Sequence, residues 1–286
     1  YAMDFMKKYE YWLNSDSIDE KDKEELRGLK DNPKEIEDRF FKDLSFGTGG
    51  IRGVRGIGTN RINKYVIRKA TQGLANYMLT FNEKEAKEQG IIIAHDCRIG
   101  SREYALNTAR VMAANGIKAY IYEDLRSTPE LSFGVRYKGT MAGIVVTASH
   151  NPVEYNGYKV YWNDGAQVVD PHATLIVDEV NKISTLEEIK VISEENGREK
   201  GLIIQLDNKI DDDYIKEIKK QTIISEIPGK ESFKIVYTPL HGTGGRPMER
   251  ILTDFGYSYE VVKEQIKPDG NFPTVTYANP EEIAAF

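Results

Sequence analysis

Apolar residues between positions 64 and 162 follow two alternating patterns. Short runs rich in β-branched residues have the length and composition of strands that are buried on both faces; they lie at residues 91–94, 119–122 and 143–146. The segments between and before them repeat apolar side chains every three or four positions, which predicts helices at residues 64–81, 101–115 and 129–137. This alternation favours an α/β fold with three α/β/α layers and a mostly parallel, doubly wound sheet.

The flanking regions have different patterns. Residues 1–44 combine charged segments with apolar residues at helical spacing, which predicts an N-terminal helical arm. A polar stretch at 184–201 is typical of a boundary region, and a further strand, helix and strand are expected between residues 233 and 262. We therefore expect a first α/β domain at 45–205 and the first part of a second α/β domain at 206–286.

Composition narrows the functional class. The formal net charge of −6 over 286 residues argues against general nucleic-acid binding. A single cysteine, Cys97, excludes an intrachain disulfide framework and fits a reducing compartment. The N-terminus does not resemble a signal peptide, and no apolar run approaches the roughly 20 residues of a membrane helix. We expect a cytoplasmic protein that binds neither nucleic acid nor membranes; its oligomeric state is unknown.

The strand predicted at 143–146 leads into Thr147-Ala-Ser-His-Asn-Pro152. Pro152 cannot donate a ladder hydrogen bond, so Ser149 should lie in a tight, exposed loop at the carboxyl end of the strand, where α/β sheets bind ligands. Asn156-Gly157 has the sequence of a hairpin turn, and a returning strand at 158–161 would bring Lys159 back towards Ser149 and His150. The alternative is a polar turn followed by an exposed lysine.

A glycine-rich segment, Phe46-Gly-Thr-Gly-Gly-Ile-Arg-Gly53, precedes the first predicted domain helix. It does not fit the dinucleotide fingerprint G-x-G-x-x-G, because Arg52 occupies the last glycine position. Its N–H groups and Arg52 suit an anion, although a flexible loop with a surface arginine is the simpler alternative. Gly-Thr-Gly-Gly recurs at 242–245 before Arg246. Arg98 follows the strand at 91–94 and is expected either near Ser149 or, as we favour, in an ion pair with Asp96.

Four of these segments resemble one enzyme family. T-A-S-H-N-P (147–152) followed by Y-N-G-Y-K-V-Y (155–161) is similar to the phosphoserine loop of the α-D-phosphohexomutases. F-G-T-G-G-I-R-G (46–53) and Y-T-P-L-H-G-T-G-G (237–245) resemble the phosphoglucomutase and phosphopentomutase branch in particular. The resemblance implies a magnesium-dependent mutase acting on small-molecule sugar phosphates, with glucose 1,6-bisphosphate as the activating intermediate.

The resemblance also implies roles for individual residues. Phosphorylated Ser149 would donate its phosphoryl group to a hydroxyl of glucose 1-phosphate and would offer a phosphate oxygen to Mg²⁺. Lys159 is the best candidate general acid or base, and His150 would either share that role or orient the loop. Arg52 would contact phosphate near the serine. The residues expected to bind substrate or phosphate are Thr48, Gly49, Gly50, Arg52, Arg98 and Asn151.

Two departures and several alternatives qualify this prediction. The family's metal loop, D-x-D-x-D-R, does not occur in the chain, and neither do the later sugar-recognition loops. We therefore expect a piece of a longer protein that cannot turn over alone. Phosphopentomutase and phosphomannomutase are the alternative activities. Two other classes are a serine hydrolase using Ser149 and His150, although G-x-S-x-G is absent, and a non-catalytic sugar-phosphate-binding protein.

Overall fold

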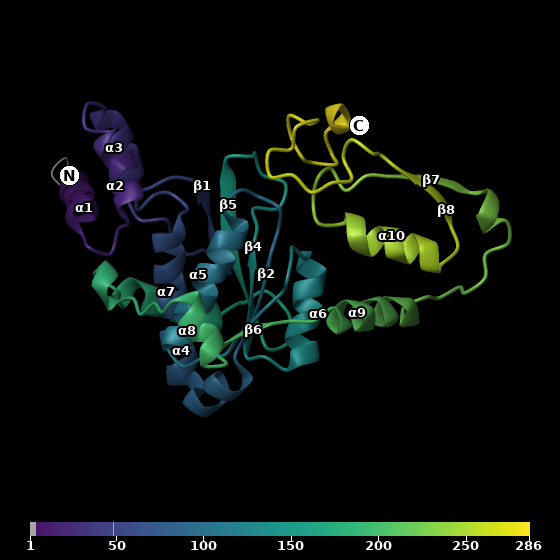
Figure 1. Cartoon of the computed structure of the whole chain (residues 1–286), viewed down its shortest axis with the longest axis horizontal. Coiled ribbons are helices and arrows are strands. Elements are labelled where there is room, and N and C mark those ends of the chain that lie inside the picture. Colours follow the sequence, from purple (N-terminus) through teal and green to yellow (C-terminus); the bar gives the residue numbers. More distant parts are fainter. Residues whose placement is uncertain (1–3, 48) are drawn as a thin grey trace.

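The computed structural model describes residues 4–47 and 49–286. Figure 1 shows a central sheet flanked by helices, with an N-terminal helical arm near one edge and the C-terminal segment on the other side. This arrangement confirms the predicted α/β fold class. The proposed domain limits at 45, 205 and 206 remain predictions.

The central sheet has six strands in the order β1-β5-β4-β2-β3-β6. Strands β4, β2, β3 and β6 run parallel, whereas β5 is antiparallel to both of its neighbours, β4 and β1. The strands are β1 (Gly50–Val54), β2 (Ile91–His95), β3 (Ala119–Ile121), β4 (Ala142–Val146), β5 (Tyr155–Trp162) and β6 (Ile203–Gln205). The sheet is thus parallel at its centre and mixed at the edge that carries β5 and β1.

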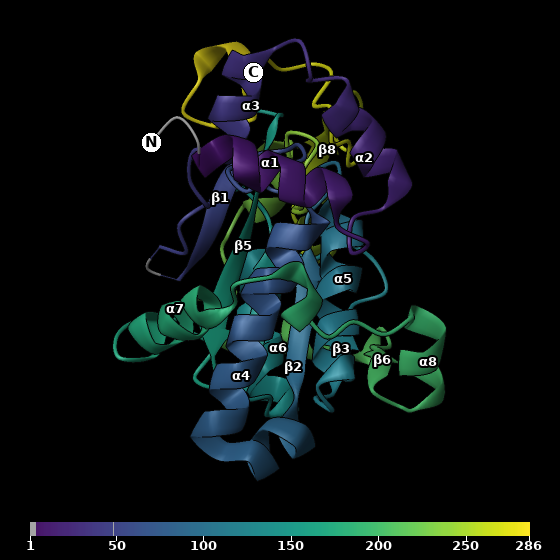
Figure 2. The same ribbon diagram turned by 90° about the vertical axis from the view of Figure 1, so that its left-hand side faces the viewer.

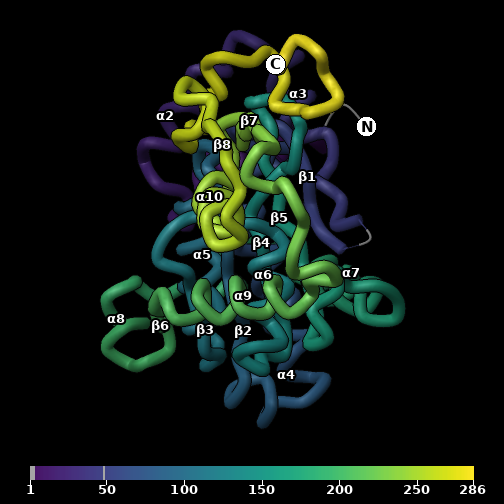
Figure 3. The backbone as a smooth tube through the Cα atoms, turned by 90° about the vertical axis from the view of Figure 1, so that its right-hand side faces the viewer, coloured from purple at the N-terminus to yellow at the C-terminus, as the bar shows by residue number. Residues whose placement is uncertain are grey.

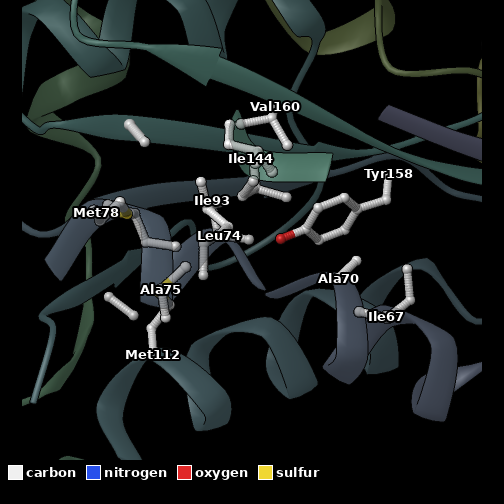
Figure 4. Packing of buried hydrophobic residues seen from close by; sticks show 14 of the residues in the cluster. Ile67, Ala70, Leu74, Ala75, Met78, Ile93, Met112, Ile144, Tyr158 and Val160 are labelled. Atoms are coloured by element: carbon white, nitrogen blue, oxygen red, sulfur yellow. The ribbon is translucent and has the colours of Figure 1, made fainter. Parts of the chain in front are cut away.

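Helices cover both faces of this sheet, which explains why β2 and β4 are buried along their whole length. One face carries α4 (Lys64–Gln89), α5 (Ser101–Ala114) and α7 (His172–Lys182), and the other carries α6 (Thr128–Lys138) (Figure 2). Ile91 and Ile93 point into the first layer, and Ile92 points into the second. Figure 4 shows Ile93 and Ile144 packed against Leu74 in the larger core.

The predicted helix at 64–81 proves longer, because α4 continues to Gln89. Asn82 nevertheless has non-helical dihedral angles (φ −162°, ψ 94°), so the first straight segment ends where the sequence predicted. Two short elements complete this region: α8 (Glu194–Glu199) lies beside β6, and α9 (Lys209–Lys220) packs against α6.

The N-terminal arm contains three helices, α1 (Asp4–Asn14), α2 (Glu20–Arg27) and α3 (Pro33–Phe40). Their apolar side chains form a second core with Tyr65 of α4. Trp12 lies edge-to-face against both Phe40 and Tyr65, with ring centroids 5.7 and 5.6 Å apart. The arm therefore serves packing, because its buried apolar residues attach it to the first domain.

The C-terminal region has a separate two-stranded sheet, whose strands β7 and β8 are labelled near each other on the backbone trace of Figure 3. Strands β7 (Lys234–Tyr237) and β8 (Ser258–Val261) are parallel and are connected through α10 (Gly245–Asp254). This is the strand, helix and strand order that the sequence predicted. Three short 3₁₀ turns lie at Leu186–Glu188, Lys230–Ser232 and Ile283–Ala285.

The hairpin turn predicted at Asn156-Gly157 is wrong, because both residues lie inside β5. Asn156 is fully buried, and its side-chain amide donates to Ser101 Oγ at 2.9 Å. Gly157 is required by a close approach of strands: a Cβ atom there would lie 2.5 Å from the carbonyl oxygen of Thr147 and 2.9 Å from that of Ile51. The reversal of the chain occurs earlier, where Tyr155 N donates to Pro152 O at 3.0 Å.

Among residues 4–47 and 49–286, no helix combines the length and the apolar character needed to cross a membrane.

We predict that Gly157→Ala lowers the free energy of unfolding by about 1–3 kcal/mol, because the added methyl group forces β4 or β1 to move. The comparison variant is Gly47→Ala, whose Cβ would meet only the Gly50 carbonyl oxygen at 3.7 Å. Chemical denaturation of the two variants checks this. Equal stability of both would contradict the close approach of the three strands.

Candidate active site

Ser149 occupies the loop between β4 and β5, and its backbone is left-handed (φ 56°). The residue is exposed, although the two residues before it are buried. A non-glycine residue in this conformation costs on the order of 1–2 kcal/mol, so neighbouring contacts must hold it there. The sequence correctly placed Ser149 in an exposed loop at the carboxyl end of a strand, but it gave no sign of the strained backbone.

The carboxylate of Asp96 holds the loop through the hydroxyl group of Thr147. Thr147 Oγ1 donates to Asp96 Oδ2 at 2.6 Å, and the same hydroxyl accepts a hydrogen bond from Ser149 N at 3.0 Å. The other carboxylate oxygen accepts from Ser101 Oγ at 2.6 Å and from Arg98 N at 2.9 Å. Gly100 is the residue before the first turn of α5, and the Ser101 hydroxyl binds Asp96.

Arg98 also holds the loop, through the backbone carbonyls. Its guanidinium donates to four backbone carbonyls: Nη1 to Pro152 O (2.8 Å) and Tyr155 O (3.1 Å), Nη2 to Ser149 O (2.9 Å) and Asn151 O (2.6 Å). Only 3% of the residue is exposed, and burial lowers its pKa. These contacts leave both terminal nitrogens engaged with backbone, so Arg98 supports the loop, and its predicted phosphate contact stays a prediction.

The ion pair that the sequence favoured between Asp96 and Arg98 is present, with Arg98 Nε 3.5 Å from Asp96 Oδ2. This distance is long for a hydrogen bond, and Arg98 Nε has no hydrogen-bond partner in the described part of the chain. Asp96 holds the serine loop through hydroxyl groups, and Arg98 holds it through backbone carbonyls.

Arg52 and Lys159 face the same side of the sheet. In the β1–β5 register Arg52 is opposite Gly157 and Gly50 is opposite Lys159, so the two cations are diagonal neighbours. Lys159 also pairs with Val145 of β4, which belongs to the core on the α6 side. Burial first and the charge of Arg52 second lower the pKa of Lys159. The strand that carries Lys159 therefore brings it beside Arg52, and the predicted approach of Lys159 to Ser149 and His150 stays a prediction.

His150 is exposed, and its Nδ1 lies 3.4 Å from Ser149 Oγ. Adjacent residues were not expected to approach each other in this way. Within the described residues His150 forms no ion pair or hydrogen bond with a carboxylate. A hydrolytic triad needs a third group that orients the histidine, and the described site does not provide one.

The glycine turn lies away from the serine loop. In the sheet register Gly50 is paired with Lys159, and Lys159 is paired with Val145, which lies inside β4. Gly50 N donates to Gly47 O at 3.3 Å, and Gly49 O accepts from Val160 N at 2.9 Å. Glycine is needed at position 50 because a Cβ atom would meet Tyr158 O at 2.1 Å. Phosphate binding by Gly49 and Gly50 remains a prediction, and Thr48 lies outside the described residues.

Asn151 belongs to the serine loop, where its backbone N donates to Ala148 O at 3.1 Å. Its side-chain Oδ1 is buried and has no hydrogen-bond partner among the described residues. An amide oxygen accepts hydrogen bonds and repels phosphate oxygens, so only its NH₂ group could contact a phosphate. The predicted phosphate contact of Asn151 stays a prediction.

The described residues do not form a magnesium site by themselves. In residues 4–47 and 49–286, no three His, Cys, Asp or Glu side chains gather closely enough to hold a metal ion. Both oxygens of Asp96 already accept hydrogen bonds. A phosphate on Ser149 would supply a single oxygen, whereas Mg²⁺ takes six ligands at near-octahedral geometry. This chain alone therefore does not fit the ion.

Two of the cavities outside the serine loop lie near segments discussed above. One of about 340 Å³ is lined by Trp12, Phe46 and Tyr65, on the face of the sheet opposite Arg52. The other, of about 370 Å³, lies between Arg126 and the second Gly-Thr-Gly-Gly loop. Arg126 is held there by Asp211, through hydrogen bonds of 2.8 and 2.9 Å.

Sequence reasoning missed Thr147, Ser101 and Asn156 as members of the site. Thr147 belonged to the recognised loop, but its hydroxyl bond to Asp96 depends on β2 and β4 being neighbours. The only available signal was that Asp96 and Ser149 both follow buried strands.

We predict that Arg52→Gln raises the pKa of Lys159, because it removes a nearby positive charge, and that the rise is smaller than the lowering due to burial. The amine signal of Lys159, followed by NMR across a pH titration, measures this. Arg102→Gln removes an exposed cation that does not act on Lys159 and serves as the control. An unchanged titration in Arg52→Gln would contradict the proximity of the two side chains.

Comparison with known proteins identifies the family of the chain. The family description "Phosphoglucomutase/phosphomannomutase, alpha/beta/alpha domain I" matches residues 43–187, and that of domain II matches residues 212–286. A phosphoglucomutase from Staphylococcus saprophyticus is 40% identical over 244 residues, which are 85% of this chain and 43% of the relative. One from Staphylococcus aureus (strain MRSA252) is 38% identical over 265 residues, 91% of this chain and 46% of the relative. The chain thus spans less than half the length of these curated relatives.

Solved structures with the same fold are more distant in sequence. A phosphoglucomutase/phosphomannomutase family protein from Burkholderia thailandensis has a TM-score of 0.64 at 21% identity, covering 84% of this chain and 48% of its own. The open form of parafusin, a phosphoglucomutase from Paramecium, has a TM-score of 0.59 at 20% identity, covering 80% and 44%. These likenesses concern the fold alone. The matches of the two family descriptions over residues 43–187 and 212–286 place the chain in the phosphoglucomutase/phosphomannomutase family, the α-D-phosphohexomutases, as the four sequence motifs predicted.

Proposed function

We propose that the full-length protein is an intramolecular phosphotransferase that interconverts a sugar 1-phosphate and a sugar 6-phosphate, with glucose as the sugar. The printed names of relatives at 38–40% identity, all phosphoglucomutases, support this substrate. The chain covers 43–46% of those relatives, so the activity is proposed for the full-length protein and not for these 286 residues alone.

The observation that carries the proposal is the exposed, left-handed Ser149 held by a buried network. Strained backbone persists where surrounding contacts over-determine it, and it is concentrated at functional sites. Thr147 holds the amide of Ser149, and Arg98 holds its carbonyl. The side chain is thereby presented to solvent with little freedom of the backbone, as an alcohol that carries a phosphoryl group requires.

Ser149 carries the phosphoryl group in the resting enzyme. In the first half of the reaction the bond between Ser149 Oγ and phosphorus breaks, and a bond forms between phosphorus and a hydroxyl oxygen of the sugar phosphate. The hydroxyl proton passes to a base, and the Ser149 oxygen that leaves phosphorus takes up a proton. The product of this step is a sugar bisphosphate, which turns over in the site and returns its other phosphate to Ser149.

Lys159 is the base in this proposal, since burial and Arg52 favour its neutral form. A lysine with a lowered pKa has a larger neutral fraction near pH 7 than an ordinary lysine has. Arg52 supplies the positive charge that phosphoryl transfer needs beside the migrating group. His150, at 3.4 Å from Ser149 Oγ, orients the loop or shares the proton transfer.

Mg²⁺ and glucose 1,6-bisphosphate remain expectations for the full-length protein, based on the family resemblance. The ion would supply electrostatic neutralisation of the phosphates. Mannose and pentose phosphates are the alternative substrates, and the described residues contain no feature that favours either. A hydrolase is disfavoured because no carboxylate orients His150 in the described site.

We predict that Ser149→Ala lowers the mutase rate of the full-length protein by roughly a thousandfold or more, because the covalent carrier is lost. The assay follows glucose 1-phosphate conversion, with mannose 1-phosphate and ribose 1-phosphate as comparison substrates. Intact-protein mass spectrometry should detect one phosphate in the wild type and none in the variant.

The matched control is Ser184→Ala, which removes an exposed hydroxyl at the end of α7. It should retain both the phosphate and the rate. Full activity in Ser149→Ala would refute the phosphoserine mechanism, and a phosphate found on another residue would relocate the carrier.

A further inference from the structure

Arg98 has a second neighbour, which comes from the C-terminal region. The guanidinium carbon lies 5.2 Å from the centre of the Phe272 ring. Phe272 is 8% exposed and has a left-handed backbone (φ 48°). An arginine over an aromatic face is stabilised by a cation–π contact, which strengthens when water is excluded. Arg98 therefore binds the serine loop at its hydrogen-bonding edge and the C-terminal region at its flat face.

The segment that carries Phe272 is fitted closely to the backbone around Arg98. A Cβ atom at Gly270 would lie 2.6 Å from Cys97 O and 2.9 Å from Ile99 N. Only a glycine allows this approach, so residues 269–272 touch the 97–99 segment along the backbone itself. Phe272 N donates to Asp269 O at 3.1 Å, which closes the turn that presents the ring.

A further contact joins the same two segments. Cys97 Sγ donates to the carbonyl oxygen of His241 at 3.1 Å, and that oxygen also accepts from Asp269 N at 3.1 Å. Burial raises the pKa of Cys97 to about 12, so the thiol keeps the proton that this bond needs. The loop that follows β7 and the turn at 269–272 thus both contact the 97–99 segment.

The serine loop itself is not joined to the C-terminal region by direct polar contacts. Across the described residues, no hydrogen bond or ion pair connects residues 147–155 with residues 234–286. The contact nearest to the loop is made by Arg98, whose four hydrogen bonds to carbonyls connect the turn at 269–272 with residues 149–155.

We propose that Arg98 is a positioning residue that couples the turn at 269–272 of the C-terminal domain to the conformation of the Ser149 loop. The proposal rests on the proposed function only for its effect on catalysis. With Phe272 in place the guanidinium is held flat and in register with the four carbonyls. Without the ring, the guanidinium gains freedom, and the left-handed backbone at Ser149 loses part of its support.

Hydrogen–deuterium exchange of the full-length protein tests the coupling, because it needs no turnover. Phe272→Leu should speed amide exchange within residues 147–155 by roughly three- to tenfold, the range that corresponds to loss of a partly buried cation–π contact. Phe272→Tyr keeps the aromatic face and should restore the wild-type rate. Phe233→Leu, which alters a 64% exposed ring in the same region, should leave the loop unchanged.

Two further measurements separate positioning from general stability. Arg98→Lys, which cannot reach four carbonyls at once, should speed exchange in the same loop. In the active protein, Phe272→Leu should lower kcat by roughly three- to tenfold with KM nearly unchanged, and Phe272→Tyr should recover kcat.

The outcomes are distinct. Loop exchange that responds to Arg98→Lys but not to Phe272→Leu would overturn the coupling to the C-terminal domain. Exchange that rises throughout the protein in Phe272→Leu, and not mainly in 147–155, would also overturn it, since the ring would then serve general packing. Absence of mutase activity in the wild type would refute the proposed function and leave the exchange result standing.

Discussion

The site depends on one constraint: the chain must be held in a left-handed turn at a residue that is not glycine. Two oppositely charged side chains provide the support, Asp96 below the loop and Arg98 beside it. Both come from the segment that follows β2, and the serine follows the adjacent strand β4. The parallel pairing of these two strands therefore places the support under the reactive side chain, and the rest of the sheet keeps them in register.

The strands and helices of the first domain could be predicted because local pattern and tertiary environment agree there. The side chains of Ile91, Ile92 and Ile93 alternate between the two faces of β2. All three are apolar because helices cover both faces. The local sequence pattern gave a wrong prediction where the role of a residue depends on a contact with a residue far away in the chain. Asn156-Gly157 has the sequence of a turn. In the structure, however, Asn156 donates a hydrogen bond to Ser101, and Gly157 allows the close approach of Thr147 and Ile51.

The candidate site divides in the same way. The exposed position of Ser149 was predictable, because a strand end can be recognised from neighbouring residues, whereas the strand that carries Lys159 was predicted from a turn that the structure does not have. The role of Arg98 was not predictable, since its four carbonyl partners lie more than 50 positions further along the chain. The contact with Phe272 is more distant still, and a turn sequence at 269–273 gives no indication of the surface it touches.

The backbone at position 149 also restricts which hydroxyl-bearing side chain can stand there. Threonine has the same hydroxyl chemistry as serine, but its branched Cβ is poorly accommodated at φ 56°. The choice between two chemically equivalent groups is thus made by main-chain geometry and not by reactivity. A lineage that exchanged this serine for threonine would first have to rebuild the turn, and with it the hydrogen bonds that Arg98 makes to the loop.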